Sequence, residues 1–101
     1  MNNTLVGRVT SISKGTNGNL VLCLDGTEAN GALSMIVCEI NIFRDPELLK
    51  WAEEKLKYDH LIWARLWTQR KTIRIGTEVL LVNVTYARKI EIRDKPGGLI
   101  V

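Results

Sequence analysis

Two tryptophans and an arginine occupy alternate positions in the segment LIWARLWTQRK, residues 61–71. Successive side chains of a β-strand leave on opposite faces, so Trp63, Arg65 and Trp67 share one face, while the aliphatic residues between them fill the other. Tryptophan rings accept stacked bases, and an arginine beside them attracts phosphate or stacks as well. The segment therefore favours a surface that binds nucleic acid. The alternative is that a partner subunit or the helix covers this face.

Charge is unevenly distributed along the chain. The formal net charge is +3, and five of the 11 acidic residues fall between Asp45 and Asp59. From Arg65 to Lys95, eight basic residues stand against three acidic ones. A basic stripe of this kind is typical of nucleic-acid binders. Charge alone, however, favours the alternative of an ordinary solvated surface.

Composition and length limit the class of protein. With 101 residues, 46% of them hydrophobic and 25% charged, the chain suits one globular domain. No apolar run approaches the roughly 20 residues of a membrane span, and no signal peptide is recognisable, so we expect a cytoplasmic protein with reduced thiols. Two cysteines and one histidine give no zinc pattern, and we expect neither a metal nor a cofactor. His60 stands alone and is expected to be a solvated loop residue.

Hydrophobic periodicity predicts five strands and one helix. Residues 5–13, 20–25, 33–43 and 61–75 alternate like strands, and residues 77–92 form a fifth strand with a bend or bulge near residues 83–87. A helix follows the third strand. Asp45 suits its N-cap, Pro46 suits its first position, and an apolar stripe follows, made by Leu48, Leu49, Ala52 and Leu56.

The order strand, strand, strand, helix, strand, strand predicts an all-β fold with one helix, the five-stranded OB-fold barrel. Two hairpins packed against a helix would use the same elements and are the alternative. We expect the domain to span residues 1–95, and residues 96–101, which follow Lys95, to form a short tail.

Several segments resemble the bacterial single-stranded DNA-binding proteins and the related, shorter PriB-like proteins. The sequence LVGRV at residues 5–9 is similar to the family's first strand, and INIF at residues 40–43 to the end of its third, where an aromatic residue faces the DNA. IWARLWT at residues 62–68 and TEV at residues 77–79 resemble its fourth and fifth strands. Val37 stands where the family has a tryptophan, and Glu39 stands where a basic residue is common. Residues 96–101 contain no acidic residue of the kind that forms the tip of the bacterial proteins, and in this the segment resembles PriB.

This resemblance implies a homo-oligomer, most simply a dimer, that binds single-stranded nucleic acid without enzymatic activity. We expect DNA rather than RNA and a role in replication or recombination, although stacking and phosphate contacts suit both nucleic acids. The expected binding residues lie on outward strand positions, in the first loop and near the last turn. They are Arg8, Lys14, Phe43, Trp63, Arg65, Trp67, Arg70, Lys71 and Arg74.

A protein-binding adaptor and an enzyme are the two alternative functions. An OB-fold adaptor that binds protein would use Trp63 and Trp67 as interface anchors, because tryptophan and arginine dominate interaction hot spots. An enzyme is disfavoured, because the sequence offers no nucleophile with a base, no paired inward carboxylates and no glycine-rich phosphate loop. We therefore identify no catalytic residue.

Overall fold

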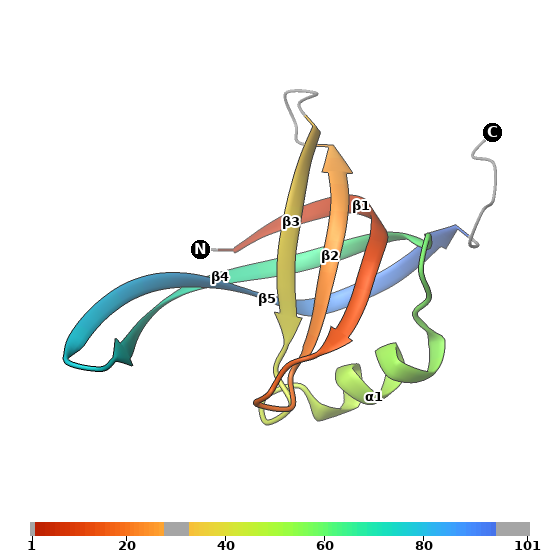
Figure 1. Cartoon of the computed structure of the whole chain (residues 1–101). Coiled ribbons are helices and arrows are strands. Elements are labelled where there is room, and N and C mark those ends of the chain that lie inside the picture. Colours follow the sequence, from red (N-terminus) through yellow and green to blue (C-terminus); the bar gives the residue numbers. More distant parts are fainter. Residues whose placement is uncertain (1, 28–32, 95–101) are drawn as a thin grey trace.

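A computed structural model describes residues 2–27 and 33–94 of the chain. The strands are β1 (Asn2–Lys14), β2 (Leu20–Thr27), β3 (Leu33–Ile40), β4 (Leu61–Ile75) and β5 (Glu78–Asp94), and the helix α1 (Pro46–Lys55) lies between β3 and β4. The strands close into a barrel in the order β1-β2-β3-β5-β4 (Figure 1). This is the predicted OB-fold, and it excludes two separate hairpins packed against a helix.

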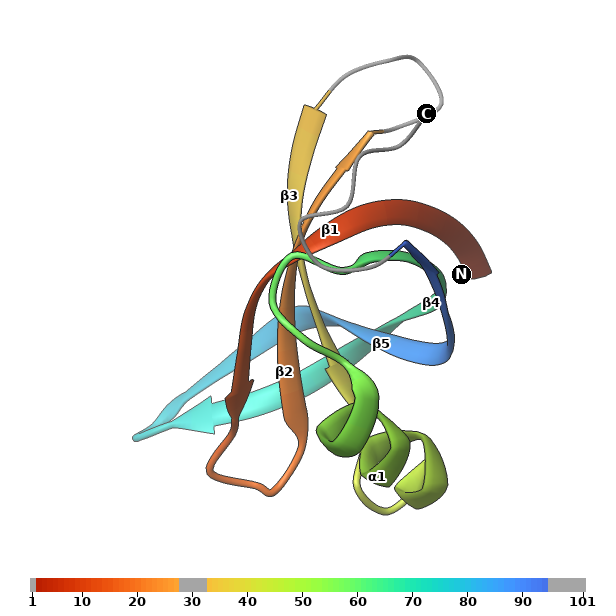
Figure 2. The same ribbon diagram turned by 90° about the vertical axis from the view of Figure 1, so that its right-hand side faces the viewer.

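The barrel interior is formed by the predicted inward side chains. Leu22, Leu24, Cys38, Ile40 and Ile62 are fully buried, as expected for alternating strands that curve around a core. Helix α1 adds Leu49, Ala52 and Leu56 to the same core, and Figure 2 shows the helix lying across the end of the barrel where β1 and β3 end. The predicted stripe of the helix therefore closes one end of the barrel.

Close strand approach explains the inward glycine of β1. A Cβ atom added at Gly7 would lie 2.7 Å from the carbonyl oxygen of Asp25 on β2, a contact that no ordinary side chain makes. Gly76 has a φ of 61° in the two-residue turn between Ile75 and Glu78, where a residue without a Cβ atom is favoured. The predicted turn at Gly76 is therefore confirmed.

Two local predictions were wrong, and a third was correct to within one residue. Strand β3 ends at Ile40 rather than at Phe43, because Asn41 begins a turn. The bulge predicted near residues 83–87 of β5 lies at Arg88, since Lys89 pairs with Arg65 and Ala87 with Leu66, and a second register shift at Arg93 was not predicted. His60 is buried rather than solvated, and its Nδ1 accepts a hydrogen bond from the Lys57 backbone N–H at 2.9 Å. These features depend on side-chain hydrogen bonds and on strand register, which hydrophobic periodicity does not report.

Beyond the barrel, β4 and β5 continue as a two-stranded arm, residues 68–85. No residue of the arm is buried, and its cross-strand pairs run from Thr68↔Thr85 to Ile75↔Glu78. Figure 1 shows the arm reaching away from the barrel, and the molecule measures 53 Å along its longest axis against 32 and 20 Å along the others. The bounds of β4 were predicted correctly, but the projection of the hairpin into solvent was not anticipated.

Candidate nucleic-acid interface

The structure distributes the nine predicted binding residues over three places. Lys14 and Phe43 lie at the end of the barrel that α1 closes, and Arg70, Lys71 and Arg74 lie on the arm. The other four are on the outer side of the sheet made by β1 and β4: Arg8, Trp63, Arg65 and Trp67. The residues therefore do not form one patch, and each place has its own chemistry.

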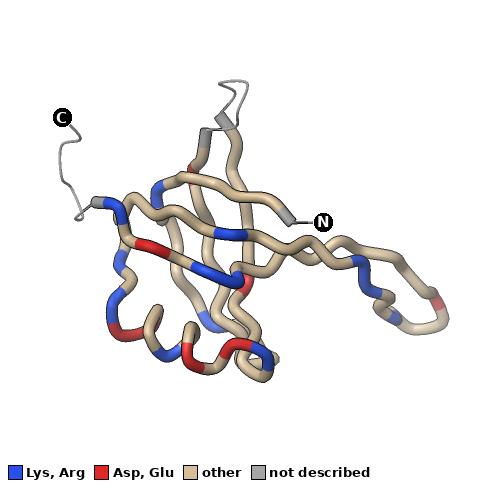
Figure 3. Tube along the Cα trace, turned by 180° about the vertical axis from the view of Figure 1, so that it is seen from behind, with Lys and Arg blue, Asp and Glu red and all other residues tan. Residues whose placement is uncertain are grey.

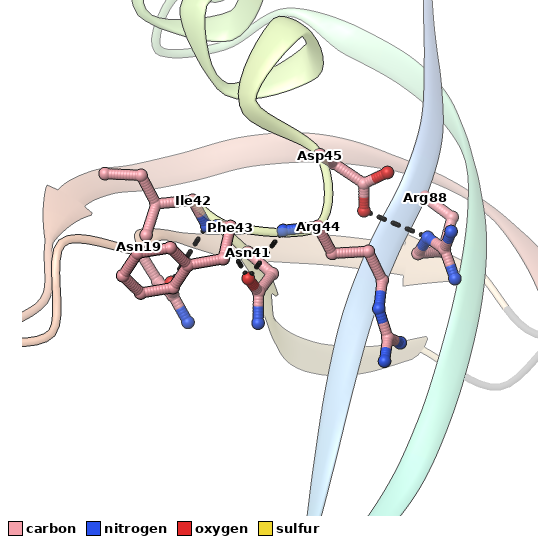
Figure 4. A network of polar contacts seen from close by, with 7 residues as sticks. All are labelled: Asn19, Asn41, Ile42, Phe43, Arg44, Asp45 and Arg88. Atoms are coloured by element: carbon pink, nitrogen blue, oxygen red, sulfur yellow. Dashed lines mark hydrogen bonds and ion pairs between the residues drawn. The ribbon is translucent and has the colours of Figure 1, made fainter.

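Phe43 sits in a tight turn, residues 41–44, which we call the Phe43 turn. The Asn41 side-chain oxygen Oδ1 accepts hydrogen bonds from the backbone N–H groups of Phe43 and Arg44, at 2.8 and 3.0 Å (Figure 4). An asparagine that binds the backbone two residues on is a common turn former. These hydrogen bonds fix the backbone of Phe43 and Arg44, while Phe43 remains 89% exposed. An exposed aromatic ring on a fixed backbone is suited to stacking with a planar ligand.

A second asparagine ties the Phe43 turn to the β1–β2 loop. Asn19 is only 4% exposed, and its side-chain oxygen accepts a hydrogen bond from the Ile42 backbone N–H at 3.0 Å. Its side-chain nitrogen donates to Oε1 of Glu39, also at 3.0 Å. The sequence places Glu39 on a face where it would repel phosphate. In the structure, one of its carboxylate oxygens accepts the hydrogen bond that helps Asn19 to hold the Phe43 turn against the β1–β2 loop.

Two arginines beside the turn were missed by the sequence reasoning. Arg44 is exposed directly after Phe43, and Figure 4 shows its side chain extending away from the turn. Arg88 Nε lies 2.9 Å from Oδ2 of Asp45, so this carboxylate forms an ion pair instead of capping α1 with a side-chain hydrogen bond. The sequence could have indicated Arg44 as a binding residue, because it directly follows the aromatic Phe43. Arg88 could not be found in this way, because only the folded structure brings it next to Asp45.

Lys14 belongs to the same end of the barrel. It pairs with Leu20, which in turn pairs with Ile40, so the ends of β1 and β3 lie on either side of the start of β2. Its Nζ lies 3.7 Å from Oε1 of Glu53 on α1, with both side chains about half exposed. An exposed pair at this distance holds the lysine weakly, so an anionic ligand can compete for it.

The arm presents its basic residues on two faces. Arg70 and Arg74 alternate on one face, and Lys71 lies on the other, where its Nζ is 5.0 Å from the centre of the Tyr86 ring. A cation at this distance over a ring is attracted by the negative face of the aromatic system. The ammonium group of Lys71 thus extends toward the base of the arm, where Tyr86 lies next to the barrel.

On β4 the predicted split between the two faces is confirmed. Ile62, Ala64 and Leu66 are buried, while Trp67 is 40% exposed and Trp63 is partly buried. Arg8 points from β1 toward the loop before β4, where its Nη1 donates to the Asp59 carbonyl oxygen at 2.9 Å. Arg8 therefore helps to hold that loop in place.

The outer face of β2 and β3, where OB-folds commonly bind oligonucleotides, carries no aromatic residue in its described part. Met35 and Val37 of β3 are exposed there, and Cys23 of β2, which pairs with Val37, is partly exposed. Thioether and aliphatic groups make an apolar surface but not a flat stacking platform. The aromatic contact at this side of the barrel is instead offered by Phe43.

The described ranges contain neither a metal-binding cluster nor a membrane-spanning helix. Residues 2–27 and 33–94 contain no group of three His, Cys, Asp or Glu side chains that could hold a metal ion. Over the same ranges, no helix is long and apolar enough to cross a membrane.

Comparison with known proteins gives a likeness of structure only. No protein-family model and no curated protein sequence matches the chain. Among solved structures, the chain resembles the mitochondrial single-stranded DNA-binding protein Rim1 from S. cerevisiae. One crystal form superimposes with a TM-score of 0.67 at 14% identity, covering 98% of each chain. A second form gives a TM-score of 0.66 at 12% identity, covering 92% of this chain and 94% of the other. At these identities the likeness shows the shared OB-fold.

Proposed function

We propose that this protein is a non-enzymatic single-stranded DNA-binding protein with little sequence preference. It would act in the cytoplasm on intermediates of replication or recombination, as a short relative of the bacterial single-stranded DNA-binding and PriB-like proteins. Rim1, whose solved structures share this fold, is a mitochondrial single-stranded DNA-binding protein, which supports this choice of ligand. The observation that carries the proposal is the Phe43 turn.

The Phe43 turn offers a base-stacking contact at low entropic cost. Phe43 leaves 89% of its side chain in water although its backbone is fixed by Asn41, so little backbone order remains to be gained when a base stacks on the ring. Stacking contributes about 1–3 kcal/mol per base and tolerates every base, because each has a π-face. Bases in a duplex are already stacked and are not available to such a ring.

Cations around the turn would bind the backbone of the same strand. Arg44 follows Phe43 directly, and Lys14 is held only weakly by Glu53 at the same end of the barrel. The arm adds Arg70, Lys71 and Arg74. Phosphate contacts of this type release counterions, so the affinity should fall as salt concentration rises.

The test is a binding measurement with fluorescently labelled oligo(dT), a duplex of the same length and oligo(rU), each at two salt concentrations. We expect oligo(dT) to bind more tightly than the duplex and than oligo(rU). Phe43→Ala should weaken oligo(dT) binding by about 5- to 150-fold, the equivalent of one lost stacking contact, and Phe43→Trp should restore it. Tyr58→Ala is the matched control, since Tyr58 is another exposed aromatic residue at 67%. Equal affinity for single strands and duplex would refute the proposal.

An adaptor that binds protein is the second candidate, and the arm favours it. Ile75, Val79 and Leu81 are 61, 55 and 67% exposed, and exposed apolar groups gathered on one element usually mark a contact with another protein. We propose that this partner is a second copy of the chain, so that the apolar side chains of the arm make a homodimer while its basic side chains remain available to nucleic acid. A protein that remains dimeric and binds neither labelled oligo(dT) nor the duplex would favour the adaptor alone.

A further inference from the structure

A cluster of cations surrounds one tryptophan on the side of the barrel opposite β2 and β3. We call this surface the back face and define it by Val6, Trp63, Arg65, Lys89, Glu91 and Arg93. The register places these residues together, because Trp63 pairs with Val6 on β1 and with Glu91 on β5, and Arg65 pairs with Lys89. Figure 1 shows β2 and β3 in front of β4, and Figure 3, seen from behind, shows basic positions along β4 and β5.

Three positive groups approach the ring of Trp63. The guanidinium carbons of Arg65 and Arg93 lie 5.8 and 5.9 Å from its centre, and Nζ of Lys89 lies at 5.9 Å. Each is within the distance at which a cation is attracted by an aromatic face. The ring therefore offsets part of the repulsion among three like charges and holds them in one place.

The cluster is left with an excess of positive charge. Glu91 is its one carboxylate, 3.8 Å from Arg93, and both side chains of this pair are about half exposed, so the pairing is weak. Within the described part of the chain, neither Arg65 nor Lys89 pairs with a carboxylate, and both are exposed. Three cations and one anion leave two positive charges whose outer N–H groups are available to a ligand.

This arrangement changes the role of Trp63. Its ring is partly buried and bordered by cations, so it is poorly placed to stack with a base. Arg65 and Lys89 lie toward the arm from Trp63, and Arg93 lies on the other side of it along β5. The cations thus flank the ring along the strand direction, which fits a linear ligand with repeated negative charges.

We propose that the back face is a second binding site for single-stranded nucleic acid, one that contacts the phosphate backbone rather than the bases. The proposal rests on the function proposed above, because it assigns to the back face a further segment of a strand that is bound at the Phe43 turn. Arginine binds phosphate with two parallel N–H groups, and Arg65 and Arg93 both carry this fork. A second copy of the back face is a poor occupant, because two surfaces of the same excess charge repel each other.

The test compares oligonucleotides of two lengths on two charge variants. Arg65→Gln with Lys89→Gln removes two cations from the back face, and Lys50→Gln with Lys55→Gln removes two exposed cations from α1 as a matched control. An oligo(dT) of eight nucleotides is short enough to be held by the Phe43 turn alone, whereas one of 30 nucleotides can reach both sites. Thermal unfolding of both variants should match the unmodified protein, since all four side chains are exposed.

We expect the back-face variant to bind the long oligonucleotide several-fold more weakly and the short one with unchanged affinity. The slope of log affinity against log salt for the long oligonucleotide should become shallower by about 1.4, two phosphate contacts at about 0.7 each. The α1 control should change neither quantity. Phe43→Ala should weaken binding of both the short and the long oligonucleotide. If Phe43→Ala leaves both affinities unchanged, that result counts against the proposed function and not against the back-face site.

Two results would overturn the back-face site while leaving the proposed function intact. One is an effect of the back-face variant on the long oligonucleotide that is no larger than that of the α1 control. The other is binding of a poly-glutamate peptide that the back-face variant abolishes while oligonucleotide binding is unchanged, which would assign this face to an acidic protein.

Discussion

Single asparagine side chains set the geometry of the Phe43 turn. Asn41 binds the backbone of Phe43 and Arg44, and Asn19 binds the backbone of Ile42 from the neighbouring loop. Asn41→Ala removes the one side-chain oxygen that accepts both hydrogen bonds and should lower the free energy of unfolding by about 1–2 kcal/mol, the usual net contribution of one or two hydrogen bonds. It should also weaken oligo(dT) binding, because the Phe43 ring loses its fixed backbone while remaining present. Denaturant unfolding and a binding titration measure the two effects.

A control separates this positioning role from general destabilisation. Asn3→Ala removes an exposed asparagine at the start of β1 and should leave both quantities unchanged. Asn41→Asp keeps an acceptor oxygen at the same place and should recover most of the lost stability. An Asn41→Ala protein that is destabilised but binds oligo(dT) normally would show that the turn does not position Phe43 for the ligand.

The two cysteines differ in reactivity because they face opposite sides of the barrel wall. Cys38 is fully buried opposite Leu22, whereas Cys23 is partly exposed opposite Val37. Burial raises the pKa of the Cys38 thiol to about 12, with smaller contributions from Cys23 and Glu39. Because the thiolate is the reactive form, a thiol reagent at pH 8 should modify Cys23 alone in the native protein and both residues after unfolding. Modification of Cys38 in Cys23→Ser under native conditions would contradict this.

The same burial predicts how stability depends on alkaline pH. Below the ordinary thiol pKa of 9.0, Cys38 is protonated in both the folded and the unfolded chain and contributes no pH dependence. Between 9.0 and about 12 the unfolded chain releases this proton and the folded chain retains it, so unfolding is favoured as pH rises. Comparing denaturation midpoints of the unmodified protein and Cys38→Ala at pH 8 and pH 10 measures the effect. The unmodified protein should lose more stability than the variant.

At the scale of elements, the strands and the helix were predictable because their patterns are local. The alternation in β4 predicts which side chains are inward, and the structure buries Ile62, Ala64 and Leu66 accordingly. Pro46 marks the first position of α1, as predicted. The order of elements then predicted the OB-fold but left two hairpins packed against a helix as an alternative, which only the closed barrel excludes.

Features that depend on pairing between segments could not be predicted from local pattern. Ile40, Asn41, Ile42 and Phe43 alternate like a strand, yet the hydrogen bonds of Asn41 and Asn19 turn the chain after Ile40. The cations around Trp63 come from both β4 and β5 and depend on a bulge at Arg88 that sets the register. Composition indicated a basic last third but not its division between the arm and the back face.

The arm should contribute charge to binding rather than stability. Arg70, Lys71 and Arg74 are all exposed, so changing the three to alanine should alter the unfolding free energy by little. If each contacts a phosphate, the salt slope for oligo(dT) should become shallower by about 2, since each contact contributes about 0.7. The measurement is affinity at several salt concentrations. An unchanged affinity and slope would exclude the arm from the nucleic-acid interface and favour its use as a protein contact.

Lys71 provides an internal control within the arm. It lies on the opposite face from Arg70 and Arg74 and close to the Tyr86 ring. Two variants can be compared: Lys71→Ala, and Arg70→Ala combined with Arg74→Ala. If only one face of the arm contacts the nucleic acid, the change in salt slope per charge removed should differ between them. Equal effects per charge would indicate that the strand contacts both faces.

At the scale of the whole molecule, three surfaces with different chemistry surround one barrel. The Phe43 turn offers an exposed ring, the back face offers clustered cations, and the arm offers apolar side chains in addition to charge. A small protein that leaves so much apolar surface on a projecting element is expected to cover it with a partner. The back face carries too much positive charge for self-association, which leaves the arm as the surface for a second copy.

One face of the arm is suited to pairing with itself. Ile73 pairs with Leu80, and on the same face Lys71 lies two residues toward the barrel while Glu78 lies two residues toward the tip. If two arms pack antiparallel across a twofold axis through the Ile73–Leu80 pair, Lys71 of each copy comes near Glu78 of the other. A twofold contact of this kind uses the same patch on both copies. The face is therefore complementary to itself in both apolar surface and charge.

The expected mass at micromolar concentration is twice that of the chain. Ile73→Ser with Leu80→Ser removes the centre of the apolar contact and should shift the protein to monomer, because each buried side chain of this size contributes about 1.5–3 kcal/mol. Met35→Ser with Val37→Ser, an exposed apolar pair on the outer face of β3, is the matched control and should leave the mass at two copies. Sedimentation equilibrium measures the mass in each case. A monomeric unmodified protein would refute the dimer, and a dimer that survives the arm substitutions would place its interface elsewhere on β1, β4 or β5.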